Sequence, residues 1–237
     1  MEIGIIGGTG NMGRGLAIRL SLKHGVLMGS RDPEKAQRIA RELNGLARGF
    51  YQAEMEGGIT GLVNAEAVEA SEVVIVTLPP EAAVPVMREL SGGLTPEHIV
   101  VSTVVPMTRR RRLFYWTPLQ EGKAPSNGRR SAAESIQEAG GPAPVVSAFQ
   151  TVPAAYLNNI DAVLNVDVLI AGDDDLAVAK VSRLVRDIPN LRPLRVGPLE
   201  NSKWIESITP LLLNAAILNG LHDPTIRVVP WMPSQEP

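Results

Sequence analysis

Three glycines near the start of the chain have the spacing of a dinucleotide-binding loop. Gly8, Gly10 and Gly13 form the pattern G-x-G-x-x-G between an apolar run, residues 2–6, and a helical pattern that begins at Asn11. Such glycines permit a tight turn and let the backbone approach a pyrophosphate, which the N–H groups at the start of the helix bind. The segment could instead be a tight strand-to-helix turn without a ligand, but its position favours a nucleotide site.

The residues after the second predicted strand bear on which dinucleotide binds. NAD enzymes place Asp or Glu here to bind the ribose 2′-hydroxyl, whereas this chain has Ser30 and Arg31. A hydroxyl and a guanidinium can hold a 2′-phosphate through charge-assisted hydrogen bonds. Asp32 follows directly, but before Pro33 it is expected to cap a helix, and Lys35 could add a second cation. The sequence therefore predicts NADP rather than NAD.

Groups for proton transfer or metal binding are few. The chain has no cysteine, and His24, His98 and His222 are far apart in the sequence, so no metal site is predicted. Reduction of a carbonyl or imine usually needs a proton donor near the hydride acceptor, and Lys203 and Tyr156 are the candidates for that reaction. The lack of a convincing acid suits hydride transfer between two cofactors, where orientation supplies most of the rate. A sensor that binds NADP(H) without catalysis is a third alternative.

Composition limits the class of protein. The 237 residues are 44% hydrophobic and carry a net charge of −2, so a core can form and no excess of basic residues points to nucleic acid. The most apolar stretch, residues 73–87, is interrupted by prolines and a glutamate, so no membrane span is expected. The absence of cysteine and of a recognisable signal sequence favours a cytoplasmic protein.

Short apolar runs alternate with helical patterns up to about residue 150, which is typical of a parallel sheet wrapped by helices. Strands are predicted at residues 2–6, 26–28, 73–77, 99–102, 145–149, 166–171 and 191–196. Helices are predicted at residues 11–24, 32–46, 64–70, 81–90, 129–138, 174–186 and 201–221, the last kinked at Pro210. Residues 44–59 are predicted to be irregular and residues 107–128 to form an exposed loop.

Several segments together resemble the F420-dependent NADP oxidoreductases. These are residues 7–15, 29–31, 59–61, 172–175, 197–202, 206–207 and 209–211, and the resemblance extends over roughly residues 1–222. It implies reversible hydride transfer between reduced coenzyme F420 and NADP⁺. The implied fold is α/β, with a Rossmann-type doubly wound parallel sheet in residues 1–152, a small C-terminal α+β domain in residues 153–222 that closes over a cleft, and a tail in residues 223–237.

The resemblance also implies roles for individual residues. NADP would contact Gly8, Thr9, Gly10, Asn11, Met12, Gly13, Ser30, Arg31 and Lys35. The cofactor cleft would be lined by Leu78, Pro79, Val104 and Val105. The F420 side would involve Ala148, Gln150, Val152, Pro153, Ser207 and Thr209. No residue would act as acid or base; Ser207, Thr209 and Gln150 would position the ring.

Three further features of the sequence bear on the site and on the oligomeric state. Gln150 stands where some relatives carry a histidine, so its role must be hydrogen bonding rather than titration. Arg109, Arg110, Arg111 and Arg112 could attract the phosphate and glutamate tail of F420, or they could be a solvated surface run. The last predicted helix is apolar over most of its circumference, which fits either a homodimer or burial within the C-terminal domain.

Overall fold

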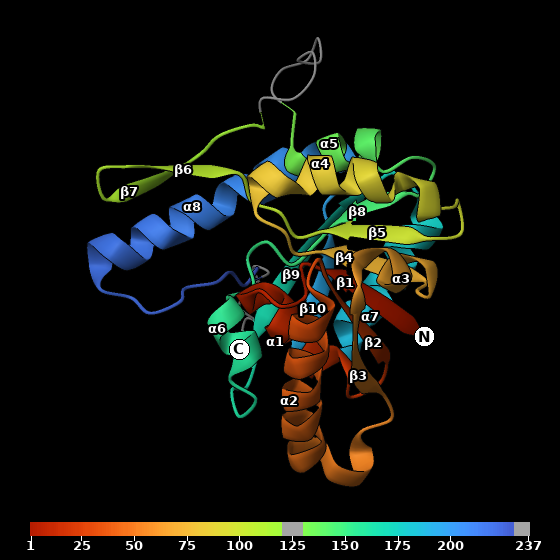
Figure 1. Ribbon diagram of the computed structural model, residues 1–237. Coiled ribbons are helices and arrows are strands. Elements are labelled where there is room, and N and C mark those ends of the chain that lie inside the picture. The colour runs from red at the N-terminus through yellow and green to blue at the C-terminus, as the bar shows by residue number, and fades with distance from the viewer. Residues whose placement is uncertain (120–129, 230–237) are drawn as a thin grey trace, which may run out of the picture.

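The computed structural model describes residues 1–119 and 130–229, and a mixed sheet lies at its centre (Figure 1). Its strands are β1 (Glu2–Ile6), β2 (Gly25–Ser30), β3 (Gly58–Val63), β4 (Val73–Val76), β5 (Ile99–Ser102), β8 (Val145–Ser147), β9 (Val166–Gly172) and β10 (Leu191–Arg195). They lie in the order β10-β9-β8-β5-β4-β1-β2-β3. All neighbouring strands are parallel except β8 and β9. The predicted α/β Rossmann-type fold is confirmed, with one antiparallel junction in a sheet predicted to be parallel.

Helices cover both faces of this sheet. They are α1 (Asn11–Leu20), α2 (Pro33–Tyr51), α3 (Asn64–Glu69), α4 (Pro80–Leu90), α5 (Ala132–Ala139), α6 (Ala154–Asn158), α7 (Asp175–Asp187) and α8 (Ser202–Asn219). Buried residues of α1, α2, α6 and α7 pack on one face, and those of α3, α4 and α5 pack on the other. Within β1, Ile3 and Ile5 belong to the first core and Ile6 to the second, as the alternation of side chains along a strand requires.

The strand order contains the reversal that creates a ligand crevice in sheets of this kind. The chain runs from β1 outward to β2 and β3, then returns to β4 on the opposite side of β1. Ligands of open α/β sheets bind at such a switch point, outside the carboxyl ends of the strands. The ends of β1 and β4 therefore mark where a cofactor would bind. Strands β9 and β10 extend the same sheet, and the division at residue 152 stays a prediction.

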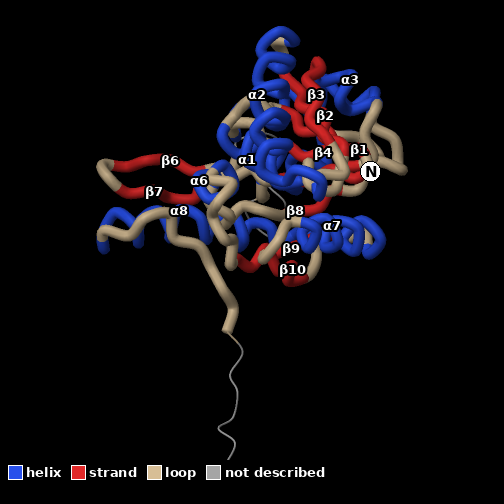
Figure 2. The backbone as a smooth tube through the Cα atoms, turned by 90° about the horizontal axis from the view of Figure 1, so that it is seen from below, coloured by secondary structure: helices blue, strands red, loops and turns tan. Residues whose placement is uncertain are grey.

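A hairpin and the last helix form an arm that projects from the sheet (Figures 1 and 2). The hairpin consists of β6 (Met107–Arg110) and β7 (Leu113–Trp116), and it lies along α8. The side-chain amide of Asn214 on α8 accepts from Phe114 N at 2.7 Å and donates to Phe114 O at 2.8 Å. This amide therefore pairs with the outer edge of β7 much as a neighbouring strand would.

The expected exposed loop at residues 107–128 is wrong where the hairpin forms, and its residues 120–128 lie outside the described part. The arginine run hid the hairpin, since Arg111 stands at its turn with φ +55° in place of the glycine or asparagine that usually marks one. The irregular segment expected at residues 44–59 is confined to residues 52–57, so the prediction is wrong at both ends. Helix α2 continues through Gly45 and Gly49, where a Cβ would meet no atom within 4 Å, and β3 then pairs with β2.

Part of the segment predicted as a tail is docked on the sheet. After α8 the chain returns along the arm to the sheet (Figure 2). There the backbone N–H of Asp167 in β9 donates to Ile226 O at 3.2 Å. Residues 230–237 lie outside the described part. The short helix α6 was not predicted, and α1 ends at Leu20 rather than at His24.

Candidate cofactor-binding site

The glycine loop joins β1 to α1 and is packed too closely for side chains. A Cβ on Gly13 would lie 2.6 Å from Gly8 Cα, and a Cβ on Gly8 would lie 2.6 Å from Met28 Cγ. Gly7 has φ +77°, which other residues rarely adopt. Gly10 precedes α1, and no side chain caps that helix. Its first N–H groups are therefore available to an anion, and the predicted Thr9, Asn11 and Met12 lie in the same loop and first turn.

The end of β2 presents hydroxyl and guanidinium groups, as predicted. Asp32 is occupied as the cap of α2, because its Oδ1 accepts from Lys35 N at 2.9 Å. Ser30 and Arg31 line a hollow of about 300 Å³. Its other walls come from the start of α3 and the end of α4. Lys35 lines a neighbouring hollow on α2, together with two further arginines. Four cations and three carboxylates, those of Asp32, Glu34 and Glu89, line the two hollows, and we call this region the cationic corner. Its contact with a 2′-phosphate stays a prediction.

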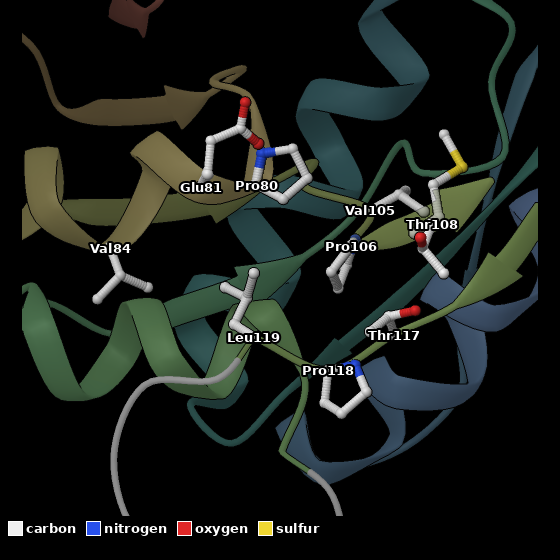
Figure 3. Close-up of a pocket in the computed structure, with 10 residues that line it drawn as sticks. Pro80, Glu81, Val84, Val105, Pro106, Thr108, Thr117, Pro118 and Leu119 are labelled. Atoms are coloured by element: carbon white, nitrogen blue, oxygen red, sulfur yellow. The ribbon is translucent and has the colours of Figure 1, made fainter. Parts of the chain in front are cut away.

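The residues predicted to line the cleft fall into two groups. Leu78 follows β4 and packs on the glycine loop, since a Cβ on Gly7 would lie 2.9 Å from Leu78 Cδ2. Pro79 caps α4, and Val104 is buried beyond β5. Val105 instead lines a larger hollow of about 490 Å³ between the start of α4 and the hairpin (Figure 3). Leu78 is thus brought to the dinucleotide loop, whereas Val105 belongs to a separate hollow.

A fourth hollow contains most of the residues predicted for F420. Gln150, Val152, Pro153 and Thr209 line this space of about 250 Å³, which we call the Gln150 hollow. The Thr209 hydroxyl donates to Gln150 O at 2.8 Å and so ties α8 to the chain that follows β8. Ala148 is fully buried and does not line the hollow. Four of the predicted residues thus lie together in one hollow, and their contact with F420 stays a prediction.

Gln150 is held firmly by its neighbours. Its Nε2 donates to Ser102 O and to Ser147 Oγ, both at 2.8 Å, while its Oε1 is buried and has no hydrogen-bond partner within the described residues. The preceding Phe149 is buried and has φ +72°, a strained conformation for a bulky residue that costs about 1–3 kcal/mol. The fold thus fixes the amide and leaves one acceptor unsatisfied.

Other candidate residues are not brought to this hollow. The Ser207 hydroxyl donates to Lys203 O, one turn earlier in α8, so a contact of Ser207 with F420 stays a prediction. The Lys203 ammonium pairs with Glu200 at 3.0 Å and lies 5.5 Å from the centre of the Trp204 ring. Tyr156 packs against the core from α6. Neither proton donor considered for a carbonyl or imine reductase therefore lines the hollow.

The four arginines of the hairpin lie on the arm. The Arg109 guanidinium lies 5.7 Å from the centre of the Phe114 ring, and that of Arg110 lies 5.4 Å from the centre of the Tyr115 ring. These stacked contacts hold two of the four cations against the partner strand. An electrostatic role toward F420 stays a prediction.

Seven residues that line the Gln150 hollow were missed. They are Met107, Thr151, Ala154, Leu212, Leu213, Asp223 and Pro224. Thr151 and Ala154 are sequence neighbours of predicted residues in the chain after β8. The two leucines follow Thr209 by three and four residues on α8, so helical spacing could have found them. The other three come from segments expected to be a loop or a tail, where the sequence carried no signal.

Glu206 is a buried carboxyl that joins three elements near the base of the arm. It accepts from Ala132 N at 3.1 Å and Ala133 N at 3.2 Å at the start of α5, and from Trp116 Nε1 at 3.2 Å on β7. Burial raises its pKa from 4.5 to about 8, although the three donors favour the charged form, and the nearby Glu134 raises it further. The sequence had marked Glu206 only as part of the family resemblance.

The strand order and glycine loop define the Rossmann class of dinucleotide-binding folds. A family model described as "NADP oxidoreductase coenzyme F420-dependent" matches residues 2–106. The chain is 36% identical over 233 residues to the F420-dependent NADP reductase of Methanocaldococcus jannaschii, covering 96% of this chain and 98% of that protein. It is 33% identical over 230 residues to the enzyme of that name from Methanothermobacter marburgensis, with the same coverage. The chain belongs to the F420-dependent NADP oxidoreductase family.

Solved structures share the fold at lower sequence identity. A putative F420-dependent NADP reductase from Arthrobacter sp. FB24 matches with a TM-score of 0.73 and 19% identity, over 97% of this chain and all of the other. An imine reductase from Bacillus cereus matches with a TM-score of 0.56 and 16% identity, over 93% of this chain and 63% of the other. At these identities the matches describe the fold alone.

Within residues 1–119 and 130–229, no group of three or more His, Asp or Glu residues could hold a metal ion. No helix of that part is long and apolar enough to cross a membrane.

Proposed function

We propose that the protein is a cytoplasmic enzyme that transfers a hydride reversibly between reduced coenzyme F420 and NADP⁺. The observation that carries this proposal is the 36% identity to a reductase of that name over nearly the whole of both chains. In the forward direction a hydride leaves the reduced deazaflavin and joins the nicotinamide of NADP⁺, which yields oxidised F420, NADPH and one proton released to water. Two electrons move with the hydride, so the step needs no covalent intermediate.

NADP(H) would bind along the glycine loop. The uncapped N-terminus of α1 would hold the pyrophosphate, and Ser30, Arg31 and Lys35 would surround the 2′-phosphate. The nicotinamide would then extend toward the end of β4, where Leu78 packs against Gly7. The support for this assignment is that the glycine loop and the Ser30–Arg31 segment follow the carboxyl ends of adjacent parallel strands, where Gly8 N donates to Gly29 O at 3.0 Å.

The deazaflavin ring of F420 would bind in the Gln150 hollow. The hollow is walled largely by apolar side chains, as an aromatic ring system requires, and it follows the carboxyl ends of β5 and β8. A buried acceptor without a partner is costly, and a ring N–H would satisfy Gln150 Oε1. Gln150 does not titrate, so its role would be to orient the ring rather than to move a proton.

The first test mixes purified protein with NADPH and oxidised F420 and follows the loss of the deazaflavin absorption band, with NADH in a parallel run. We expect rapid loss with NADPH and much slower loss with NADH. Equal rates would keep the reaction and contradict the assignment of the cationic corner. Binding of NADPH without any loss of the band would contradict the proposed reaction. It would favour an NADPH-dependent imine or carbonyl reductase, or a sensor that binds NADP(H) without catalysis.

We also propose that a second copy of this chain covers the outer face of α8. Trp204, Leu211 and Leu218 recur every seven residues on that face and are 64%, 66% and 55% exposed. This heptad spacing is typical of a helix that pairs with another helix. The stripe extends for about 20 Å along α8, and the one charged residue between Trp204 and Leu218 in the sequence, Glu206, is buried on another side of the helix. An apolar face without charges fits a two-fold homodimer, in which the same patch meets itself.

A further inference from the structure

The segment after α8 forms one wall of the Gln150 hollow. Asp223 and Pro224 line the hollow opposite residues of α8 and of the chain after β8. These two residues begin a segment, residues 223–228, that we call the strap. The sequence alone indicated a tail here, yet the strap is tied to the sheet at several points.

The first tie lies directly beside the hollow. The Thr225 hydroxyl donates to Thr151 O at 2.8 Å, and Thr151 is the residue after Gln150 and also lines the hollow. This hydrogen bond joins the strap to the same short stretch of chain that positions Gln150. A change in the strap would therefore alter the shape of this hollow before it altered any other part of the site.

The second tie is an ion pair between a buried carboxylate and a partly exposed guanidinium at the far end of the strap. Asp167 of β9 is fully buried, and Arg192 of β10 donates to both its carboxylate oxygens, at 2.7 and 2.6 Å. The same carboxylate accepts from Val228 N at 2.6 Å, and Arg192 also donates to Val228 O at 2.7 Å. These contacts hold the pKa of Asp167 below its usual range. The Asp167 carboxylate thus satisfies the backbone N–H of Val228, and the Arg192 guanidinium satisfies its C=O, at the end of the strap.

We propose that the strap sets the fit of F420 in the Gln150 hollow, with Thr225 and Asp167 as positioning residues. The inference rests on the proposed function, because it takes F420 as the occupant of that hollow. The hydrogen bonds of residues 223–228 within the described part of the chain join the strap to Thr151, Asn165, Asp167 and Arg192, and none of them reaches the glycine loop or Ser30 and Arg31. Loosening it should therefore weaken F420 binding and leave NADP(H) binding unchanged.

The test compares Thr225→Val with Thr225→Ser in the full chain. Valine keeps the shape of threonine and removes the hydroxyl, whereas serine keeps the hydroxyl. Loss of a neutral hydrogen bond should raise KM for F420 by roughly 2- to 10-fold in Thr225→Val. Because this wall contacts ground state and transition state alike, kcat should stay constant. KM for NADPH should stay within about twofold, and Thr225→Ser should behave as the unaltered protein.

Each outcome has a distinct meaning. Unchanged KM for F420 in Thr225→Val, or an equal rise for both substrates, would overturn the strap proposal while the proposed function stands. If the unaltered protein does not turn over F420, the proposed function fails, and the strap proposal fails with it. Asp167→Asn provides a second variant at the other tie. We expect a rise in KM for F420 of about tenfold, since hydrogen bonds to charged groups are stronger, and circular dichroism would show that it is folded.

Discussion

The prediction of NADP rather than NAD rests on three consecutive residues. Ser30, Arg31 and Asp32 contain both a carboxylate that would favour NAD and a guanidinium that would favour NADP. The structure separates their roles, because the Asp32 carboxylate accepts from Lys35 N as a helix cap. Sequence reasoning could predict this outcome, since a cap before a proline is a local pattern that needs no tertiary contact.

We predict that Arg31→Ala raises KM for NADPH by about 10- to 100-fold, because charge-assisted hydrogen bonds are worth about 1.5–3 kcal/mol each. KM for NADH should change little, since NADH has no 2′-phosphate. Arg183→Ala is the matched control, because Arg183 is an exposed arginine on α7. Steady-state kinetics with both nucleotides would check the prediction, and equal losses with both would contradict the role of Arg31.

At the scale of elements, the sequence predicts those strands and helices whose signal lies in their own residues. Strands β1, β4 and β5 are short apolar runs and were predicted within a residue or so of their observed ends. The hairpin and the strap were missed, because each is stabilised by distant partners: Asn214 pairs with Phe114, and Val228 with Asp167. The same reason explains the site. Thr209 and Gln150 were predicted from the family resemblance, but no pattern indicated that Asp223 would join them.

The buried carboxyl of Glu206, which joins α8 to the hairpin and to α5, should make the stability of the protein depend on pH. Its pKa is about 8 in the folded protein and 4.5 when the carboxyl is free. Between these values the folded state keeps a proton that the unfolded state has lost. The resulting stabilisation is fully present below pH 4.5 and is lost as pH rises through 8. We predict that the free energy of unfolding falls by about 2 kcal/mol between pH 6 and pH 8.

Urea denaturation at the two pH values would measure this fall. Glu206→Gln cannot ionise, so its free energy of unfolding should fall less over the same interval. The variant itself should be less stable at pH 6, because its Nε2 group would face a backbone N–H of α5 in place of a carboxyl oxygen. A fall as large in Glu206→Gln as in the unaltered protein would assign the pH dependence to other groups.

At the scale of the whole molecule, the arm of a single chain leaves one apolar side of α8 exposed to water. The sheet has helices on both faces, whereas the arm projects beyond it with α8 along the hairpin on one side (Figures 1 and 2). Asn214 and Glu206 fix the inner side of α8 to the hairpin and to α5. The outer side presents apolar residues to water. Large exposed apolar patches on soluble proteins usually mark interaction sites.

We predict that Leu211→Glu converts a dimer into a monomer. Leu211 is central in the stripe between Trp204 and Leu218, so a two-fold axis would bring two carboxylates close together in an apolar interface. Juxtaposed like charges cost several kcal/mol, which would weaken association by about 100-fold or more. Leu176→Glu is the control, because Leu176 is 83% exposed on α7, away from the arm. Light scattering coupled to size-exclusion chromatography should show a dimer for the unaltered chain and for Leu176→Glu, and a monomer for Leu211→Glu. A monomeric unaltered chain would contradict the proposed dimer. A Leu211→Glu variant that stays dimeric would place the dimer contact on another surface.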